Sequence, residues 1–123
     1  VTRIFQIWII PDRQGERPAW GAKPFPKGDR AGAFVTLASG IAGDEAALPI
    51  RADARVAGAT IKAGETVRYS LENGRHAYLV PARGKVRIGA VTASARDGIA
   101  IREEREIEVL ALEDSEVVLV DAA

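Results

Sequence analysis

The chain contains no cysteine and no methionine, and it has a single histidine among 123 residues. The lack of cysteine excludes disulfides, thiolate zinc sites and a cysteine nucleophile. Long apolar runs are also absent, since a run such as residues 117–120 is far shorter than the roughly 20 residues that a bilayer requires. With no signal-like segment either, we expect a cytoplasmic protein without a membrane partner. The missing methionine suggests that Val1 is an artificial or processing boundary rather than a natural start.

A surplus of either charge is missing as well. Lys and Arg total 17 and Asp and Glu total 17, so the formal net charge is zero. Nucleic-acid binding needs a basic surplus, which argues against such a partner. Hydrophobic residues make up 47% and charged residues 28%, as in soluble globular domains. Because no segment has the composition of an interdomain linker, we expect one domain over residues 1–123.

Alternating apolar residues and closely spaced turns dominate the sequence, and no stretch has a convincing helical period. The hairpin signal Asn73-Gly74 predicts a two-residue turn between two paired strands. On the strand before it, Val67, Tyr69 and Leu71 are expected to share one face. The predicted strands are residues 3–10, 34–38, 55–61, 66–71, 76–82, 85–88, 91–95, 98–101, 107–112 and 116–121. About ten short strands indicate an all-β sandwich or barrel.

Three other segments have weaker signals. Residues 11–33 are rich in proline and glycine and read as a long irregular connection, in which Trp20 and Phe25 pin the loop to the barrel or cover a pocket. Residues 44–48 have the composition of one helical turn, which Pro49 ends. Residues 102–108 (REEREIE) are densely charged and are interpreted as a solvated turn leading into a strand.

The order of several segments resembles the carboxy-terminal cupin domain of pirin-like proteins, which carry two β-barrels in one chain. The resemblance begins with QIWIIPDRQGERPAW (residues 6–20) and continues with AGETVRYSLENGRHAYLVPARGKVRIG (residues 63–89). ARDGIAI (residues 95–101) and ALEDSEVVLVD (residues 111–121) complete it. It implies an all-β cupin-type barrel, jelly-roll-like, built from two antiparallel sheets.

The family's activity, where it has one, resembles quercetin 2,3-dioxygenase chemistry at a metal held by three histidines and a glutamate in the amino-terminal barrel. When the first cupin metal motif is anchored on Gly84, its ligand positions fall on Ser70, Glu72 and His76, and the histidine position of the second motif, over residues 95–101, falls near Ala100. None of the four expected ligands stands in its place. His76 and Glu72 are the remaining weak metal candidates, and two ligands across a turn would leave a water-filled site. We therefore expect no cofactor, no catalytic residues and no metal site in this chain.

The resemblance favours an architectural or interaction role, in which this barrel packs against a companion cupin domain or forms a homo-oligomer. Residues 3–10 support this role because both faces of the predicted strand are apolar. Two alternatives stay open: a quercetin 2,3-dioxygenase-like oxidoreductase, and a small-molecule or regulatory protein-binding module with a pocket lined by Tyr69, His76 and Tyr78. The expected interface consists of Ile4, Phe5, Ile7, Trp8 and Ile9.

Overall fold

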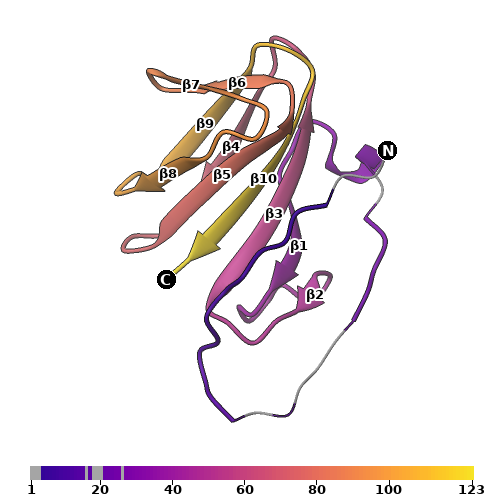
Figure 1. Cartoon of the computed structure of the whole chain (residues 1–123), viewed down its shortest axis with the longest axis vertical. Coiled ribbons are helices and arrows are strands. Elements are labelled where there is room, and N and C mark those ends of the chain that lie inside the picture. Colours follow the sequence, from indigo (N-terminus) through magenta and orange to yellow (C-terminus); the bar gives the residue numbers. More distant parts are fainter. Residues whose placement is uncertain (1–3, 16, 18–20, 26) are drawn as a thin grey trace.

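A computed structural model describes residues 4–15, 17, 21–25 and 27–123. These residues form one short 3₁₀ helix and a series of β-strands (Figure 1). The elements are η1 (Lys27–Arg30), β1 (Val35–Ser39), β2 (Leu48–Pro49), β3 (Ala54–Ile61), β4 (Thr66–Ser70), β5 (His76–Arg83), β6 (Lys85–Ile88), β7 (Val91–Ser94), β8 (Ile99–Arg102), β9 (Glu106–Ala111) and β10 (Ser115–Ala122). No helix in the described part of the chain is long and apolar enough to cross a membrane.

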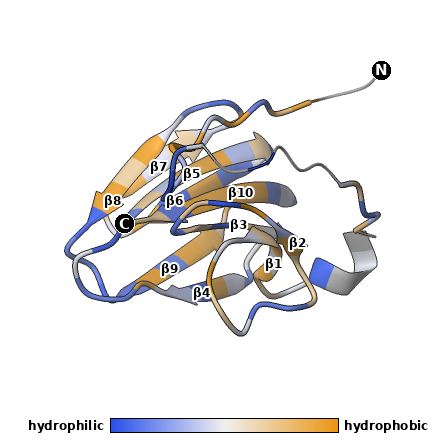
Figure 2. Cartoon of the chain, turned by 90° about the horizontal axis from the view of Figure 1, so that it is seen from below, coloured by the Kyte–Doolittle hydropathy of each residue, from blue (hydrophilic) through white to orange (hydrophobic). Residues whose placement is uncertain are grey.

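The strands form two sheets that pack face to face, so the all-β cupin-type fold predicted from the sequence is confirmed. One sheet has the order β2-β1-β3-β10-β5-β8 and the other β4-β9-β6-β7. In Figure 2, β9 and β4 lie on one side of β10 and β3, and the N-terminal segment lies on the other side. Apart from the short parallel contact of β2 with β1, the strand pairs are antiparallel.

The core lies between the sheets because side chains of opposite orientation alternate along each strand. On β10, the residues Ser115, Val117, Leu119 and Asp121 point inward and are buried. Leu119 is paired with Ala57 of β3 on one side and with Leu79 of β5 on the other. Facing them across the core are Val67, Val86, Ile107 and Val109 of the four-stranded sheet. The segments predicted from residue 34 onward coincide with β1 and β3–β10 to within a few residues.

Residues 3–10 do not form the predicted strand. Their described part, residues 4–10, runs without strand pairing over the outer face of the six-stranded sheet (Figures 1 and 2), and Arg3 lies outside the described residues. The physical reason is the sheet order: β3, β10 and β5 each have a neighbour on both sides and offer no free edge. The segment therefore lies across the sheet without joining it as a strand.

The predicted hairpin at Asn73-Gly74 is also wrong. β4 and β5 belong to different sheets, so the turn carries the chain across the core instead of joining paired strands. Gly74 has a φ of +81°, whereas Asn73 is not among the residues with positive φ, which excludes the type I′ geometry of two-residue hairpins. Crossing over lets Leu71 and Ala77, on either side of the turn, both face the same core.

The two remaining local predictions have different outcomes. At residues 44–48 the Ala47 N–H donates to the Asp44 carbonyl at 3.2 Å, which makes a single hydrogen-bonded turn that leads into β2 and not a helix. The charged residues after β8 do form a solvated turn into β9, as predicted. Glu103 in this turn has a φ of +61°.

Candidate functional site

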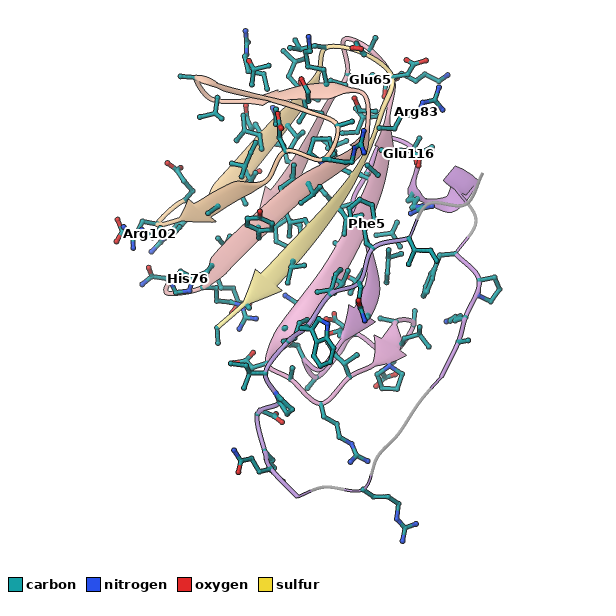
Figure 3. All side chains as sticks on the ribbon, in the orientation of Figure 1. Phe5, Glu65, His76, Arg83, Arg102 and Glu116 are labelled. Atoms are coloured by element: carbon teal, nitrogen blue, oxygen red, sulfur yellow. The ribbon has the colours of Figure 1, made fainter. Side chains whose placement is uncertain are left out.

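The four positions where the sequence motif would place metal ligands lie on the outside of the fold. Ser70, Glu72, His76 and Ala100 are all exposed. Figure 3 shows His76 at the start of β5 beside Arg102 of β8, and these two residues are register partners. Glu72 and His76 lie on either side of the crossing turn rather than opposite each other in a hairpin.

The residue next to each of these positions faces the core instead. Tyr69, Leu71, Ala77 and Ile101 are buried or packed against buried residues. Of these four side chains, only that of Tyr69 carries an atom that can bind a metal, its hydroxyl oxygen. The set therefore does not fit a site of three histidines and a glutamate. In the described residues there is no group of three or more His, Asp or Glu side chains that could hold a metal ion.

The predicted pocket residues do not come together. Tyr69 points into the core from the four-stranded sheet and packs edge-on against Phe34, with ring centroids 5.5 Å apart. His76 and Tyr78 alternate with the buried Ala77 on β5 and therefore lie on the opposite, outer face. The Tyr78 phenol covers Gly98, where an added Cβ would collide with its hydroxyl.

An ionic cluster around Asp121, which the sequence analysis missed, occupies one end of the core. The Asp121 carboxylate is completely buried. The Tyr69 hydroxyl donates to its Oδ2 at 2.7 Å, and the Arg75 Nε donates to its Oδ1 at 2.6 Å. Arg75 also donates to the Asp53 carboxylate at 2.7 Å, and the Arg55 Nη1 lies 4.0 Å from Asp121.

The cluster continues through Arg55 to the loop after β1. The Arg55 Nε donates to the Asp44 carboxylate at 2.5 Å, and the Ser39 hydroxyl donates to the same oxygen at 2.6 Å. The hydrogen bond from Arg55 holds the pKa of the Asp44 carboxyl below its ordinary value. At Tyr69, burial raises the pKa of the hydroxyl, and the hydrogen bond to Asp121 raises it further.

The Asp121 cluster joins both sheets and the loops at that end of the fold. Asp121 comes from β10, Arg55 from β3 and Tyr69 from β4, so a single carboxylate ties the six-stranded sheet to the four-stranded sheet. Its acidic and basic groups are paired with one another, which is the arrangement of a structural link rather than of a reactive centre. The sequence signal for it was present: Asp121 is a charged residue at an inward position of the alternating strand β10.

The residues predicted for an interface lie in the N-terminal segment. Ile4 is 83% exposed and Trp8 is 87% exposed, whereas Ile9 is half-buried. Phe5 lies over β10 and β3 in Figure 3 and lines a cavity together with Ala82 of β5. Ile7 is 41% exposed. In the connection that follows, Phe25 is half-buried beneath the Lys23 ammonium, and Trp20 lies outside the described residues.

The two-sheet arrangement defines the class as a cupin-type β-sandwich, and comparison with known proteins defines the family. Residues 36–122 match the quercetinase C-terminal cupin domain. The chain belongs to the pirin family and corresponds to that carboxy-terminal cupin domain.

Relatives and solved structures agree with this assignment. The chain is 63% identical over 122 residues to a Pseudomonas aeruginosa protein provisionally named a quercetin 2,3-dioxygenase, covering 99% of this chain and 53% of that protein. It is 62% identical to a pirin-like protein of Caulobacter vibrioides, with the same two coverages. The crystal structure of YhhW from Escherichia coli matches with a TM-score of 0.84 at 28% identity, over 94% of this chain and 48% of that one. The chain thus spans about half the length of the relatives it matches.

Proposed function

We propose that this chain is the non-catalytic cupin half of a two-barrel protein, and that its role is to pack against a companion cupin half. The observation that carries the proposal is the row of exposed apolar side chains in residues 4–10, laid over an apolar sheet face. Ile4, Trp8 and Ile10 are 83%, 87% and 89% exposed. A soluble domain rarely leaves so much apolar surface together unless another surface covers it.

The outer face of the six-stranded sheet extends this surface. On β10, Val118 and Val120 point outward and pair with Val80 and Tyr78 of β5. Tyr78 is 51% exposed. We call residues 4–10 together with these four side chains the docking surface. A companion half within the same protein is supported by the lengths of the relatives, because about half of each relative lies outside the aligned region.

The absence of catalysis in this half is supported by the inward side chains. Tyr69, Leu71, Ala77 and Ile101, the core-facing neighbours of the four motif positions, carry no imidazole or carboxylate group, and the buried carboxylate of Asp121 is already bonded to Arg75. The provisional name of the Pseudomonas relative favours a second candidate, a quercetin 2,3-dioxygenase activity of the whole two-barrel protein. On our proposal, a metal for such an activity is held by the other half. The cytoplasmic location expected from the sequence stays a prediction.

Elemental analysis and oxygen uptake test the non-catalytic part of the proposal. We expect the purified chain to contain no stoichiometric iron, copper, nickel or zinc, and to leave quercetin unoxidised above the rate without protein. A His76→Ala variant shows whether any bound ion depends on the single histidine of the chain. One ion per chain that resists dialysis and disappears in His76→Ala would contradict the proposal, and so would oxygen uptake with quercetin that a chelator abolishes.

A further inference from the structure

The strand β9 has one edge that is only partly paired. On one side it pairs with β4 from Glu106 to Leu110, but on the other side it pairs with β6 only at Leu110 and Ala111. Along residues 106–109, therefore, no strand of the described chain covers the second edge. An uncovered edge exposes backbone N–H and C=O groups that are able to pair with another extended chain.

The hydrogen bonds to β4 show which groups of β9 face this open side. The Ala111 N–H donates to the Glu65 carbonyl at 3.0 Å, and the Leu71 N–H donates to the Arg105 carbonyl at 2.8 Å. The backbone groups of successive residues in an antiparallel strand point to alternate sides. The odd-numbered residues thus face β4, and the N–H and C=O groups of Glu106 and Glu108 face the open side.

A second free edge lies across from it. β8 is the last strand of the six-stranded sheet and pairs only with β5. A cavity of about 540 Å³ lies between β8, β9 and the β6–β7 turn. Ile88, Ile99, Ile101 and Ile107 line it with aliphatic carbon. We call this cavity and the two strand edges beside it the seam.

The rim of the seam is acidic. Glu104, Glu106 and Glu108 line it together with one guanidinium, that of Arg102. Glu108 also makes an exposed ion pair with Arg68 at 3.1 Å. Three carboxylates against Arg102 within the lining leave an excess of negative charge, which favours a partner with basic side chains.

We propose that the seam binds an extended basic peptide segment, which adds a strand to β9. Its backbone pairs with Glu106 and Glu108, aliphatic side chains on one face enter the cavity, and Lys or Arg side chains on the other face meet the acidic rim. Strand addition to an exposed edge is an established mode of peptide recognition, with affinity from main-chain hydrogen bonds and specificity from alternate side chains. This site is separate from the docking surface, which lies on the outer face of the other sheet.

The probe is the peptide acetyl-Lys-Val-Lys-Val-Lys-amide, titrated into the isotopically labelled chain and followed by backbone amide NMR. We expect shifts at residues 99–109 and at least tenfold slower hydrogen exchange at the Glu106 and Glu108 amides. Three comparison peptides isolate the causes. One replaces every lysine by glutamate. The second is N-methylated at the valines and the third at the lysines, so that each of these two lacks the N–H donors of one peptide edge. The glutamate peptide, and the N-methylated peptide whose methylated edge faces β9, should bind at least tenfold more weakly, whereas the other N-methylated peptide should bind like the unmodified one.

A pair of protein variants separates backbone from side chain. Glu106→Ala keeps the N–H and loses the carboxylate, whereas Glu106→Pro also removes the N–H, at the first residue of a strand where proline is tolerated. We expect Glu106→Pro to bind the lysine peptide at least tenfold more weakly than Glu106→Ala does. If millimolar peptide causes no chemical-shift changes, the proposal is overturned. Equal binding of both N-methylated peptides or of the glutamate peptide also overturns it, and the peptide comparison decides the question even if Glu106→Pro does not fold.

Discussion

At the scale of single residues, the Asp121 carboxylate holds the two sheets together at one end of the core. We expect Asp121→Asn to lower the free energy of unfolding by about 3 kcal/mol, because removing one charge of a buried ion pair is strongly destabilising. Arg75, with 11% of its side chain exposed, would keep only the more exposed Asp53 carboxylate as its partner. Urea unfolding followed by circular dichroism measures the change.

The matched control for Asp121→Asn is Glu108→Gln. Glu108 forms an ion pair with Arg68, but both side chains are more than half exposed. Exposed pairs contribute about 0 to 1 kcal/mol, so Glu108→Gln should hardly move the urea midpoint. If the two variants lost stability equally, Asp121 would not be the structural link described above.

Tyr69 predicts a dependence of stability on alkaline pH. Burial, followed by the hydrogen bond to Asp121, raises the pKa of its hydroxyl above the ordinary value of 10.0. The stability from this shift is fully present below pH 10, and it is lost as the pH rises from there through the folded-state pKa, because the unfolded chain ionises first. The urea midpoint of the wild-type chain should therefore fall more steeply between pH 9.5 and 11 than that of Tyr69→Phe. Parallel curves would contradict the assignment.

The sequence predicted which residues of a single strand share a face better than it predicted which residues of different strands lie together. Tyr69 was correctly assigned to the face shared by Val67 and Leu71, because alternation along one strand is a local property. The grouping of Tyr69 with His76 and Tyr78 failed because it required the relation between two strands. A shift of one residue exchanges the two faces of a strand, and counting residues from Gly84 does not show which face of each strand points inward; Ser70, Glu72 and His76 proved to be exposed.

At the scale of elements, the turn at Gly84 fixes how β5 passes into β6. Gly84 has a φ of +85°, and a Cβ there would collide with the Asp114 carbonyl and lie 2.9 Å from the Ser115 Cα. Gly84→Ala should therefore cost backbone strain of about 1 to 2 kcal/mol together with a displacement of the β9–β10 turn. We expect a clearly lower melting temperature than for the wild-type chain, measured by calorimetry.

Gly89 is the control for this prediction. It also has a positive φ, +57°, but a Cβ there has no atom within 4 Å. Gly89→Ala should show the backbone strain alone and so lose less stability than Gly84→Ala. Equal losses would mean that the close approach to Asp114 and Ser115 does not matter.

Strands from residue 34 onward were predictable because each buries one face, so that apolar and polar residues alternate in the sequence. The strand predicted over residues 3–10 was wrong for the opposite reason, because this segment is apolar on both faces. Such a composition does not distinguish a buried strand from a segment that lies across a sheet. The crossing turn at Asn73-Gly74 was mistaken for a hairpin because a hairpin and a crossing turn share the Asn-Gly signal. Only the long-range pairing of β4 with β9 separates them.

At the scale of the whole molecule, the two proposed surfaces differ in kind. The docking surface is broad and apolar, which suits a permanent contact between barrels, whereas the seam is narrow and has an acidic rim, which suits a peptide. They also belong to different parts of the fold, since the docking surface covers the outer face of β10 and β5 and the seam opens beside β9. A variant in one should therefore leave binding at the other unchanged.

The docking surface predicts that the isolated chain associates with a second copy when no companion half is present. A symmetric dimer is the commonest arrangement by which one patch covers its own copy. Complete burial of a large apolar side chain is worth about 1.5 to 3 kcal/mol, so Ile4, Trp8 and Ile10 together offer enough to hold two copies at micromolar concentration. Light scattering should give twice the monomer mass of 13.1 kDa.

Trp8→Glu should return the monomer without loss of β-sheet signal, because Trp8 is 87% exposed and contributes little to its own fold. Gln6→Glu places the same charge at an exposed polar position of the segment and should remain dimeric. A wild-type mass of 13.1 kDa, or a dimer that Trp8→Glu leaves intact, would show that this surface does not drive self-association.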